Sequence, residues 1–346
     1  MQTQVHGGDI YSKTYRLDFS TNINPYGMPA SVREAAIKGI EMSIHYPDVQ
    51  CRELRSAISK KEKIGTDWII CGNGAAELLF TLTAALKPKK ALLAAPCFAE
   101  YEQALTAINC DIRYYFLKEE NDFLIDEDYL QDLQEDIEIA FLCNPNNPTG
   151  LVISTGLLEK IVDICKEKHI FLVLDECFME FIAEESQNPQ KKYLKKMQNL
   201  FILKAFTKMY GIPGLRLGYG LCSNEKLLYQ MKQLMQPWNV SQPAQLAGIA
   251  ACEEAEFVIK TRAYIKKERV YLAEELRKLQ FTVYDSQANY LFFKAPADLY
   301  NVCNKEGILI RNCSNYRGLT TGYYRIAVKT RKENDELLRT LKEHYE

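Results

Sequence analysis

An alternation of strand-like and helical segments between residues 68 and 174 constrains the fold of this chain more than any other feature. Strand-like runs at residues 68–71, 91–95, 112–116, 137–143 and 170–174 alternate with helical runs at 72–86, 98–107 and 155–166. Such alternation predicts an α/β fold with a mainly parallel central sheet between layers of helices. Because ligands bind beyond the carboxyl ends of such strands, the residues that follow each strand are the first candidates for a site.

The composition is that of an ordinary globular chain, with 47% hydrophobic residues, 25% charged residues and a net charge of −2. This balance gives no reason to expect a nucleic acid or an anionic membrane as partner. No apolar run is long enough to cross a bilayer and the first ten residues do not form a signal peptide, so we expect a cytoplasmic protein. The eleven cysteines and four histidines show no metal-ligand spacing, so we expect neither disulfides nor a metal site.

At 346 residues the chain is long enough for about two domains. We expect an N-terminal arm (1–30) over the active site, a large domain (31–240) that carries the sheet, and a small α+β C-terminal domain (241–346). Helical periodicity dominates from residue 224 onward and includes one long helical stretch at 245–274. The strands of the small domain are expected at 282–284, 290–293, 309–311 and 324–328.

The segment at residues 205–219 carries the main chemical signal. Thr207 precedes Lys208 directly, Arg216 follows eight residues later, and two glycines and a proline between them force a turn. A lysine amine is a nucleophile only when deprotonated, and a nearby second cation favours that state. An arginine beyond such a turn is suited to bind a phosphate with its two-pronged guanidinium. The segment therefore predicts a lysine that forms a Schiff base with a phosphorylated aldehyde cofactor; the alternative is a surface lysine beside a structural arginine.

Residues directly after the predicted strands supply further parts of a cofactor site. The glycine-rich turn before Ala75 and Ala76 opens a helix, where free N–H groups can bind a phosphate. Asp175 ends a wholly apolar strand and needs a partner there, which a protonated pyridine nitrogen would provide. Phe98 can stack on the cofactor ring, and Asn147 lies in the loop after the next strand. The alternative for Asp175 is that it caps the following helix.

Two arginines in apolar strands point to an anionic substrate. Arg311 and Arg325 lie in the predicted strands of the small domain, and an arginine in such a strand needs an anionic partner. Two of them suggest a substrate with two anionic groups, unless each pairs with Asp or Glu within the fold. In the arm, the glycines beside His6 allow the backbone to approach a ligand closely, and Asn22 lies in a polar loop. The arm can also be a segment that merely packs on the surface.

With these motifs the chain resembles the histidinol-phosphate aminotransferase group of fold-type I pyridoxal-phosphate enzymes. Within that group it is similar to the threonine-phosphate decarboxylases of cobalamin biosynthesis. The resemblance covers essentially the whole chain. The stretches that distinguish it lie at residues 6–8, 18–27, 96–101, 237–240, 288–291 and 308–325.

The resemblance implies a role for each candidate residue. Lys208 would carry the Schiff base with pyridoxal 5'-phosphate, which the large domain would bind. The cofactor phosphate would be held by Ala75, Ala76, Thr207 and Arg216, and by Tyr46 from the partner subunit of a homodimer with shared active sites. Asp175 would pair with the ring nitrogen and Asn147 with the phenolate oxygen, while Phe98 would stack on the ring. The substrate would be contacted by His6, Gly7, Asn22, Asn147, Arg311 and Arg325.

Two positions depart from the pattern of the group. Ala205 stands where many relatives carry Ser or Thr, so one phosphate donor is missing. Phe178 stands where the aminotransferases of this group usually carry Tyr, so the phenolate oxygen would have one donor fewer. The decarboxylases share this Phe, and the departure therefore favours decarboxylation.

The activity implied by the resemblance is decarboxylation of a small phosphorylated amino acid, O-phospho-L-threonine. The product would be (R)-1-amino-2-propanol O-2-phosphate, used for the linker of the cobalamin nucleotide loop. An aminotransferase acting on histidinol phosphate is the first alternative, and a decarboxylase of O-phospho-L-serine, giving ethanolamine phosphate, is the second. A cofactor-binding regulatory module would need a DNA-binding or partner domain, for which the chain leaves no room.

Overall fold

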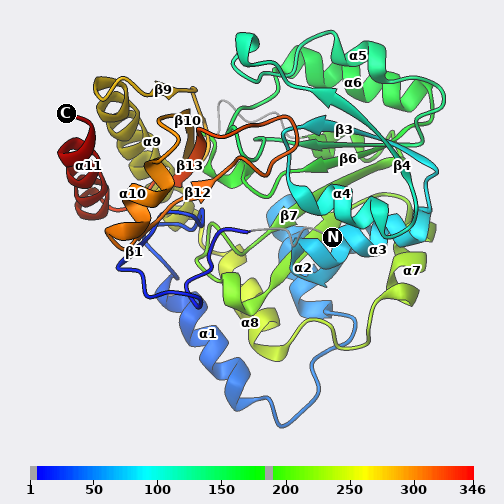
Figure 1. Ribbon diagram of the computed structural model, residues 1–346. Helices are drawn as coiled ribbons and strands as arrows, with labels where there is room; N and C mark the ends of the chain where they lie inside the picture. The colour runs from blue at the N-terminus through cyan, green and yellow to red at the C-terminus, as the bar shows by residue number, and fades with distance from the viewer. Residues whose placement is uncertain (1–5, 184–189) are drawn as a thin grey trace.

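The computed structural model describes residues 6–183 and 190–346, and its centre is a seven-stranded sheet (Figure 1). The strands follow the order β2 (Ile69–Asn73), β8 (Leu217–Leu221), β7 (Leu200–Ala205), β6 (Phe171–Asp175), β5 (Ile139–Cys143), β3 (Lys90–Ala95) and β4 (Asp111–Phe116). The pairs from β7 to β4 are parallel, and the two pairs that involve β8 are antiparallel. The predicted α/β fold with a mainly parallel central sheet is confirmed.

Helices cover both faces of this sheet. Figure 1 shows α5 (Tyr129–Asp132) and α6 (Thr155–Glu167) on one side, with α3 (Gly74–Leu86), α4 (Ala99–Thr106) and α7 (Glu225–Leu234) on the other. The inner strands β5 and β6 are buried along their whole length, which is why they read as uninterrupted apolar runs in the sequence. Short 3₁₀ segments lie at Thr66–Trp68, Glu119–Asn121, Met179–Phe181, Gln190–Tyr193 and Pro213–Leu215.

The C-terminal part contains a four-stranded antiparallel sheet. Its order is β12 (Arg311–Asn312), β13 (Tyr323–Ala327), β10 (Tyr290–Lys294) and β9 (Thr282–Val283). The helices α9 (Ala255–Lys278), α10 (Leu299–Lys305) and α11 (Arg331–Tyr345) lie around it (Figure 1). The α11 helix begins with a capping box between Thr330 and Glu333, which satisfies two of its free N–H groups.

The strand expected at 309–311 is interrupted at Ile310. Before the break, β11 (Ile308–Leu309) pairs in parallel with β1 (Leu17–Asp18) of the arm, and after it β12 pairs with β13. The arm is therefore joined by backbone hydrogen bonds to the C-terminal part of the chain. Residues 1–5 of the predicted arm lie outside the described residues.

The long helix expected at 245–274 is two helices. The first is α8 (Gln242–Cys252) and the second is α9, and the chain turns between them at Glu253 and Glu254. Helix α8 packs against α1 (Ala30–Glu41), so closely that a Cβ at Gly39 would lie 2.5 Å from the Cα of Pro243. It also contacts α2 (Arg52–Glu62). The division into domains at residue 240 stays a proposal, and this packing favours a boundary between α8 and α9.

Strands β7 and β8, on either side of the lysine segment, were not among the predicted strands. The chain reverses direction between them over residues 206–216, and this reversal makes β8 antiparallel to its neighbours. All eleven cysteines lie in the described ranges and are free thiols. Across those ranges, no helix combines the length and apolar character needed to cross a bilayer. The cytoplasmic location stays a prediction.

Candidate active site

A cavity of about 920 Å³ lies where the arm, the carboxyl ends of the parallel strands and the small antiparallel sheet meet. This volume suits a cofactor together with a small substrate. With one exception, Tyr46, every site residue predicted from the sequence lines this cavity. The lining members of that set are His6, Gly7, Asn22, Ala75, Ala76, Phe98, Asn147, Asp175, Thr207, Lys208, Arg216, Arg311 and Arg325.

Lys208 lies in the loop that follows β7. The Lys208 carbonyl accepts hydrogen bonds from the N–H of Asn24 (3.1 Å) and from the N–H of Gly211 (3.4 Å). Its Nζ lies 5.5 Å from the ring centroid of Phe178. Within residues 6–183 and 190–346, no carboxylate is close enough to Nζ to form an ion pair. The amine is therefore not occupied by an acid of the described chain, as a Schiff-base lysine requires.

Asp175 is the last residue of β6 and is buried beside the cavity. Its Oδ2 accepts a hydrogen bond from the Tyr101 hydroxyl (2.6 Å), and its Oδ1 accepts one from the N–H of Cys177 (2.9 Å). The alternative was that Asp175 caps the following helix, but the next helical segment, the 3₁₀ segment at Met179–Phe181, is preceded by Phe178. A carboxylate can accept more than two hydrogen bonds, so Asp175 can still accept one from a protonated ring nitrogen.

An anion-binding seat lies at the N-terminus of α3. The helix begins at Gly74 with φ +81°, and no side chain caps it. A Cβ at Gly74 would clash with Nη2 of Arg216, which shows how closely this side chain covers the helix end. The Thr207 hydroxyl is buried without a hydrogen-bond partner. Free N–H groups, a guanidinium and an unsatisfied hydroxyl together fit the phosphate of pyridoxal phosphate.

The remaining cofactor candidates lie on either side of this seat. Phe98 precedes α4 and packs edge-on against Tyr101, with ring centroids 5.6 Å apart. The Asn147 side-chain oxygen accepts a hydrogen bond from Nη1 of Arg325, which leaves the amide N–H₂ as the end available to a ligand. Ala205, where a phosphate donor is missing, is buried at the end of β7 and is not a lining residue.

Arg311 and Arg325 lie directly opposite each other on β12 and β13, and both are buried. Arg325 donates to the Ser20 carbonyl (2.8 Å), and its Nε is buried without a partner. Arg311 donates to the Asn312 carbonyl (3.0 Å) and to Oδ1 of Asn315 (2.9 Å). Among the carboxylates that the structure describes, none forms an ion pair with either arginine. Two buried like charges side by side require anionic partners, which a ligand can supply.

The arm closes one side of the cavity. The side-chain oxygen of Asn22 is buried without a partner, and the Asn22 carbonyl accepts a hydrogen bond from Asn289 (2.9 Å). Nδ1 of His6 lies 3.4 Å from Oε1 of Glu100. Gly7 lies so close to Ser20 that a Cβ would come within 2.5 Å of the Ser20 carbonyl oxygen. This close approach is made to another part of the arm, and the approach to a ligand expected from the glycines stays a prediction.

Tyr101 and Glu100 are among the residues of the site that received no role in the sequence analysis. Tyr101 lies one helical turn after Phe98 and holds Asp175, and this i,i+3 spacing of aromatic residues is a signal that could have identified it. Glu100 lines the cavity next to His6, and its Oε2 is buried without a partner. Burial raises the pKa of Glu100 above its ordinary value, although the attraction of His6 opposes this effect.

Tyr46 is the one predicted site residue that does not line the cavity. It is 78% exposed, and its ring stacks on Trp238 with centroids 4.5 Å apart. A residue that serves the partner subunit's site would be exposed on an isolated chain, and the position of Tyr46 is compatible with that role. Its function in the partner stays a proposal.

Comparison with known proteins gives relatives along almost the whole chain. The aminotransferase class I and II family matches residues 15–341. A threonine-phosphate decarboxylase of Salmonella typhimurium is 38% identical over 350 residues, which cover 98% of this chain and 96% of that protein. The resemblance found in the sequence is therefore confirmed.

Solved structures of similar fold include proteins of both activities. The histidinol-phosphate aminotransferase of Clostridium acetobutylicum superposes with a TM-score of 0.88 at 32% identity, covering 94% of this chain and 98% of that one. The L-threonine-O-3-phosphate decarboxylase of Porphyromonas gingivalis gives a TM-score of 0.82 at 24% identity, with 94% and 98% covered, which is a likeness of fold. The chain belongs to the aminotransferase class I and II family.

Proposed function

We propose that this chain catalyses the pyridoxal-phosphate-dependent decarboxylation of O-phospho-L-threonine to CO₂ and (R)-1-amino-2-propanol O-2-phosphate, for the linker of the cobalamin nucleotide loop. The observation that carries this proposal is that one cavity contains two separate sets of anion-binding groups. One set, Arg216 with the N-terminus of α3, suits the cofactor phosphate. The other, Arg311 with Arg325, remains for a substrate that has both a carboxylate and a phosphate.

Pyridoxal phosphate, when bound, supplies an electron sink for the electron pair of a bond broken at the substrate Cα. Lys208 would form the Schiff base with its aldehyde carbon, and Asp175 would pair with its protonated ring nitrogen. The amide of Asn147 would donate to the phenolate oxygen, and Phe98 would cover one ring face. Thr207 would add its unsatisfied hydroxyl to the phosphate seat.

The chain selects which bond at Cα breaks by orienting the substrate. The bond perpendicular to the cofactor ring breaks, because only its electrons overlap the π system. We propose that the substrate phosphate is held by Arg311 and Arg325, with His6 and Asn22 of the arm. In this orientation the bond from Cα to the carboxylate would lie perpendicular to the plane of the cofactor ring. Loss of CO₂ leaves an electron pair at Cα, which must receive one proton. The Nζ of Lys208, or a water beside it, would return that proton.

The name of the 38% identical relative supports decarboxylation. Phe178 also supports it, because this side chain lines the cavity where aminotransferases of the group usually have a tyrosine hydroxyl. Transamination of histidinol phosphate is the second candidate, since a solved relative at 32% identity carries that name. Phosphoserine is a third, because it lacks only one methyl group, a difference worth roughly 1–3 kcal/mol in a pocket.

A product assay separates these functions. The purified chain with added cofactor would be incubated with phosphothreonine, with phosphoserine, and with histidinol phosphate plus 2-oxoglutarate. We expect CO₂ and aminopropanol phosphate from the first, at a higher kcat/KM than from the second, and no glutamate from the third. Glutamate formation without CO₂ release from phosphothreonine would instead identify an aminotransferase.

We further propose that the enzyme is a homodimer in which Tyr46 of each subunit reaches the cofactor phosphate of the other. The exposed position of Tyr46 supports this arrangement, because the side chain lies outside the cavity of its own chain. Large apolar side chains near it in the sequence, Ile40, Ile44 and Val49, are also exposed. Several exposed apolar side chains in one segment are typical of a protein interface.

A further inference from the structure

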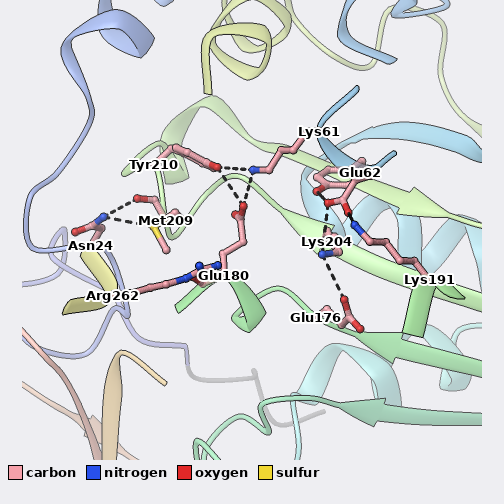
Figure 2. Close-up of polar contacts among 11 residues, drawn as sticks. Asn24, Lys61, Glu62, Glu176, Glu180, Lys191, Lys204, Met209, Tyr210 and Arg262 are labelled. Carbon is pink, nitrogen blue, oxygen red and sulfur yellow. Dashed lines mark hydrogen bonds and ion pairs between the residues drawn. The ribbon is translucent and has the colours of Figure 1, made fainter. Parts of the chain in front are cut away.

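The loop that carries Lys208 is held from two opposite sides by polar contacts (Figure 2). On one side the Tyr210 hydroxyl lies 2.5 Å from Nζ of Lys61 and 3.1 Å from Oε1 of Glu180. On the other side the loop is contacted by Asn24, a buried residue of the arm that has no place in the proposed cofactor or substrate contacts. The arm thus reaches the loop next to the reactive lysine.

Asn24 makes hydrogen bonds that involve three segments of the chain. Its backbone N–H donates to the Lys208 carbonyl (3.1 Å), and its Nδ2 donates to the Met209 carbonyl (2.8 Å). The same Nδ2 donates to Oγ1 of Thr261 on α9 (2.9 Å). Its Oδ1 accepts from the N–H of Tyr26 (3.0 Å), which fixes the orientation of the amide. One side chain therefore connects the arm, the lysine loop and α9.

The arm and the lysine loop are closely packed beside Asn24. Gly211 has φ +60°, and a Cβ there would lie 2.5 Å from the carbonyl carbon of Gly27. Arm and loop are thus in contact backbone to backbone. Thr261 is wholly buried, and the next residue, Arg262, donates from Nε to the Glu180 carbonyl (2.7 Å; Figure 2). Helix α9 is therefore anchored beside the same loop.

A few residues earlier, the arm contacts the substrate side of the cavity. The Ser20 carbonyl accepts a hydrogen bond from Arg325, and the side-chain oxygen of Asn22 is buried without a partner. Residues 20–24 therefore run from the proposed substrate-binding arginine to the carbonyls of Lys208 and Met209. The two sets of contacts are only four residues apart in the arm.

We infer that Asn24 is a positioning residue that couples substrate binding by the arm to the position of Lys208. It acts through the backbone of the lysine loop and touches neither substrate nor cofactor. Reaction rates depend steeply on the placement of reacting groups, since an error of about 1 Å can reduce a rate on the order of a hundredfold. The kinetic part of this inference rests on the proposed function, whereas the position of Lys208 can be tested with the cofactor alone.

The test compares Asn24→Ala with a matched control, Asn199→Ala. Asn199 also donates from its side-chain amide to two carbonyls, those of Cys165 (3.0 Å) and Ile170 (2.6 Å), but it precedes β7 at the end of the sheet opposite the cavity. For each holoenzyme the measurements are the visible absorbance of the lysine-bound cofactor as a function of pH, kcat and KM on phosphothreonine, and Tm.

We expect Asn24→Ala to displace the midpoint of the absorbance titration and to lower kcat on the order of ten- to a hundredfold. Asn199→Ala should lower Tm while it leaves the titration and kcat at wild-type values. If Asn24→Ala changes Tm alone, as its control does, the inference is wrong. A wild-type enzyme that is inactive on phosphothreonine would reject the proposed substrate, and the absorbance titration would still decide the role of Asn24.

Thr261→Val provides a second, milder variant in case Asn24→Ala does not fold. It keeps the size of the side chain and removes only the acceptor that connects Asn24 to α9. We expect it to move the titration midpoint in the same direction as Asn24→Ala, by a smaller amount. A folded Thr261→Val enzyme with wild-type titration and wild-type kcat would overturn the coupling.

Discussion

Asp175 has a hydrogen-bond donor on each carboxylate oxygen before any ligand is present. One of these donors, the Tyr101 hydroxyl, is a side chain and can be removed without altering the backbone. Burial, with the adjacent charge of Asp175, raises the pKa of Tyr101 well above its ordinary value, so the hydroxyl remains protonated and donates. This hydrogen bond holds the carboxylate that would pair with a protonated ring nitrogen.

We therefore expect Tyr101→Phe to weaken both cofactor retention and turnover. Loss of one hydrogen bond to a charged group costs about 1.5–3 kcal/mol, which corresponds to a roughly ten- to hundredfold weaker hold on the cofactor. Equilibrium dialysis against pyridoxal phosphate measures this affinity, and kcat measures turnover. Tyr129→Phe is a suitable control, because Tyr129 is equally buried and its hydroxyl has no hydrogen-bond partner. Equal behaviour of the two variants would contradict the role given to Tyr101.

Single site residues could be predicted from the sequence where they follow a strand or lie within an apolar strand. Asp175, Asn147 and Arg325 were found in that way, because the sheet brings the ends of its strands to one edge. Tyr101 was missed because it lies on a helix, where an aromatic residue is usually part of the core. Asn24 was missed because its partners are main-chain carbonyls, and no side-chain pattern reports which carbonyl a residue will meet.

The C-terminal end of α2 is attached to the sheet by a buried cluster of charges (Figure 2). Oε1 of Glu62 accepts a hydrogen bond from the Tyr219 hydroxyl on β8 (2.7 Å) and lies 3.5 Å from Nζ of Lys204 on β7. Its Oε2 lies 2.9 Å from Nζ of Lys191. Burial by itself would raise the pKa of Glu62, but the two lysines and the tyrosine hydroxyl outweigh it and lower the pKa to about 2.

This lowered pKa predicts a pH-dependent contribution to stability. A carboxyl that is more acidic in the folded state stabilises the fold at pH values above its unfolded pKa, near 4.5, and loses this effect as the pH falls towards about 2. The difference corresponds to roughly 3 kcal/mol. Glu62→Gln should therefore lower the free energy of unfolding most above pH 4.5, and the gap to wild type should narrow as the pH falls. Denaturant unfolding at a series of pH values measures this gap.

Glu253→Gln is the matched control, because Glu253 forms a solvent-exposed pair with Lys60 (3.1 Å). Exposed pairs contribute little, so its unfolding free energy should follow wild type at every pH. Burial raises the pKa of Glu176 and acts with the opposite sign, since it lowers stability as the pH rises above 4.5. The charge of Glu62 contributes to this raised pKa, so Glu62→Gln also relieves part of the Glu176 effect and offsets part of the expected gap. A gap that stays constant from pH 6 to about 2 would contradict the account of Glu62.

Helices and strands were predictable where a local hydrophobic pattern in the sequence defines them. The apolar strands of the parallel sheet and the helices between them follow from periodicity. The break at Ile310 was not predictable, because it arises from pairing between β11 and the arm, almost three hundred residues away. The separation of α8 from α9 was missed for a similar reason: both helices have good helical periodicity, and what distinguishes them is the surface on which each one packs.

For the whole molecule, the proposed homodimer predicts that each site contains residues of both chains. The exposed ring of Tyr46 and the phosphate seat of the same chain are separate features. If each chain supplies Tyr46 to the other, a mixed dimer of a Tyr46 variant and a Lys208 variant has both defects in one site and leaves the other site native.

Subunit mixing tests this arrangement. Lys208→Ala and Tyr46→Ala enzymes, each poorly active, would be unfolded together, refolded and assayed. Random reassortment makes about half of the dimers mixed, and each mixed dimer has one site with both native residues, so we expect about a quarter of native activity. Each variant refolded alone is the control. Absence of any gain on mixing, with dimers seen by light scattering, would place Tyr46 in its own chain's site or outside both.

The proposed function requires that Lys208 take part in a decarboxylation in this cavity. Its most direct test is a turnover of phosphothreonine by the holoenzyme in D₂O, with CO₂ and the amine product quantified and the product examined by NMR. We predict one CO₂ for each aminopropanol phosphate, one deuterium on the carbon that carried the carboxylate, and no turnover by Lys208→Ala. A keto acid as product, with the carboxylate retained, would contradict the account.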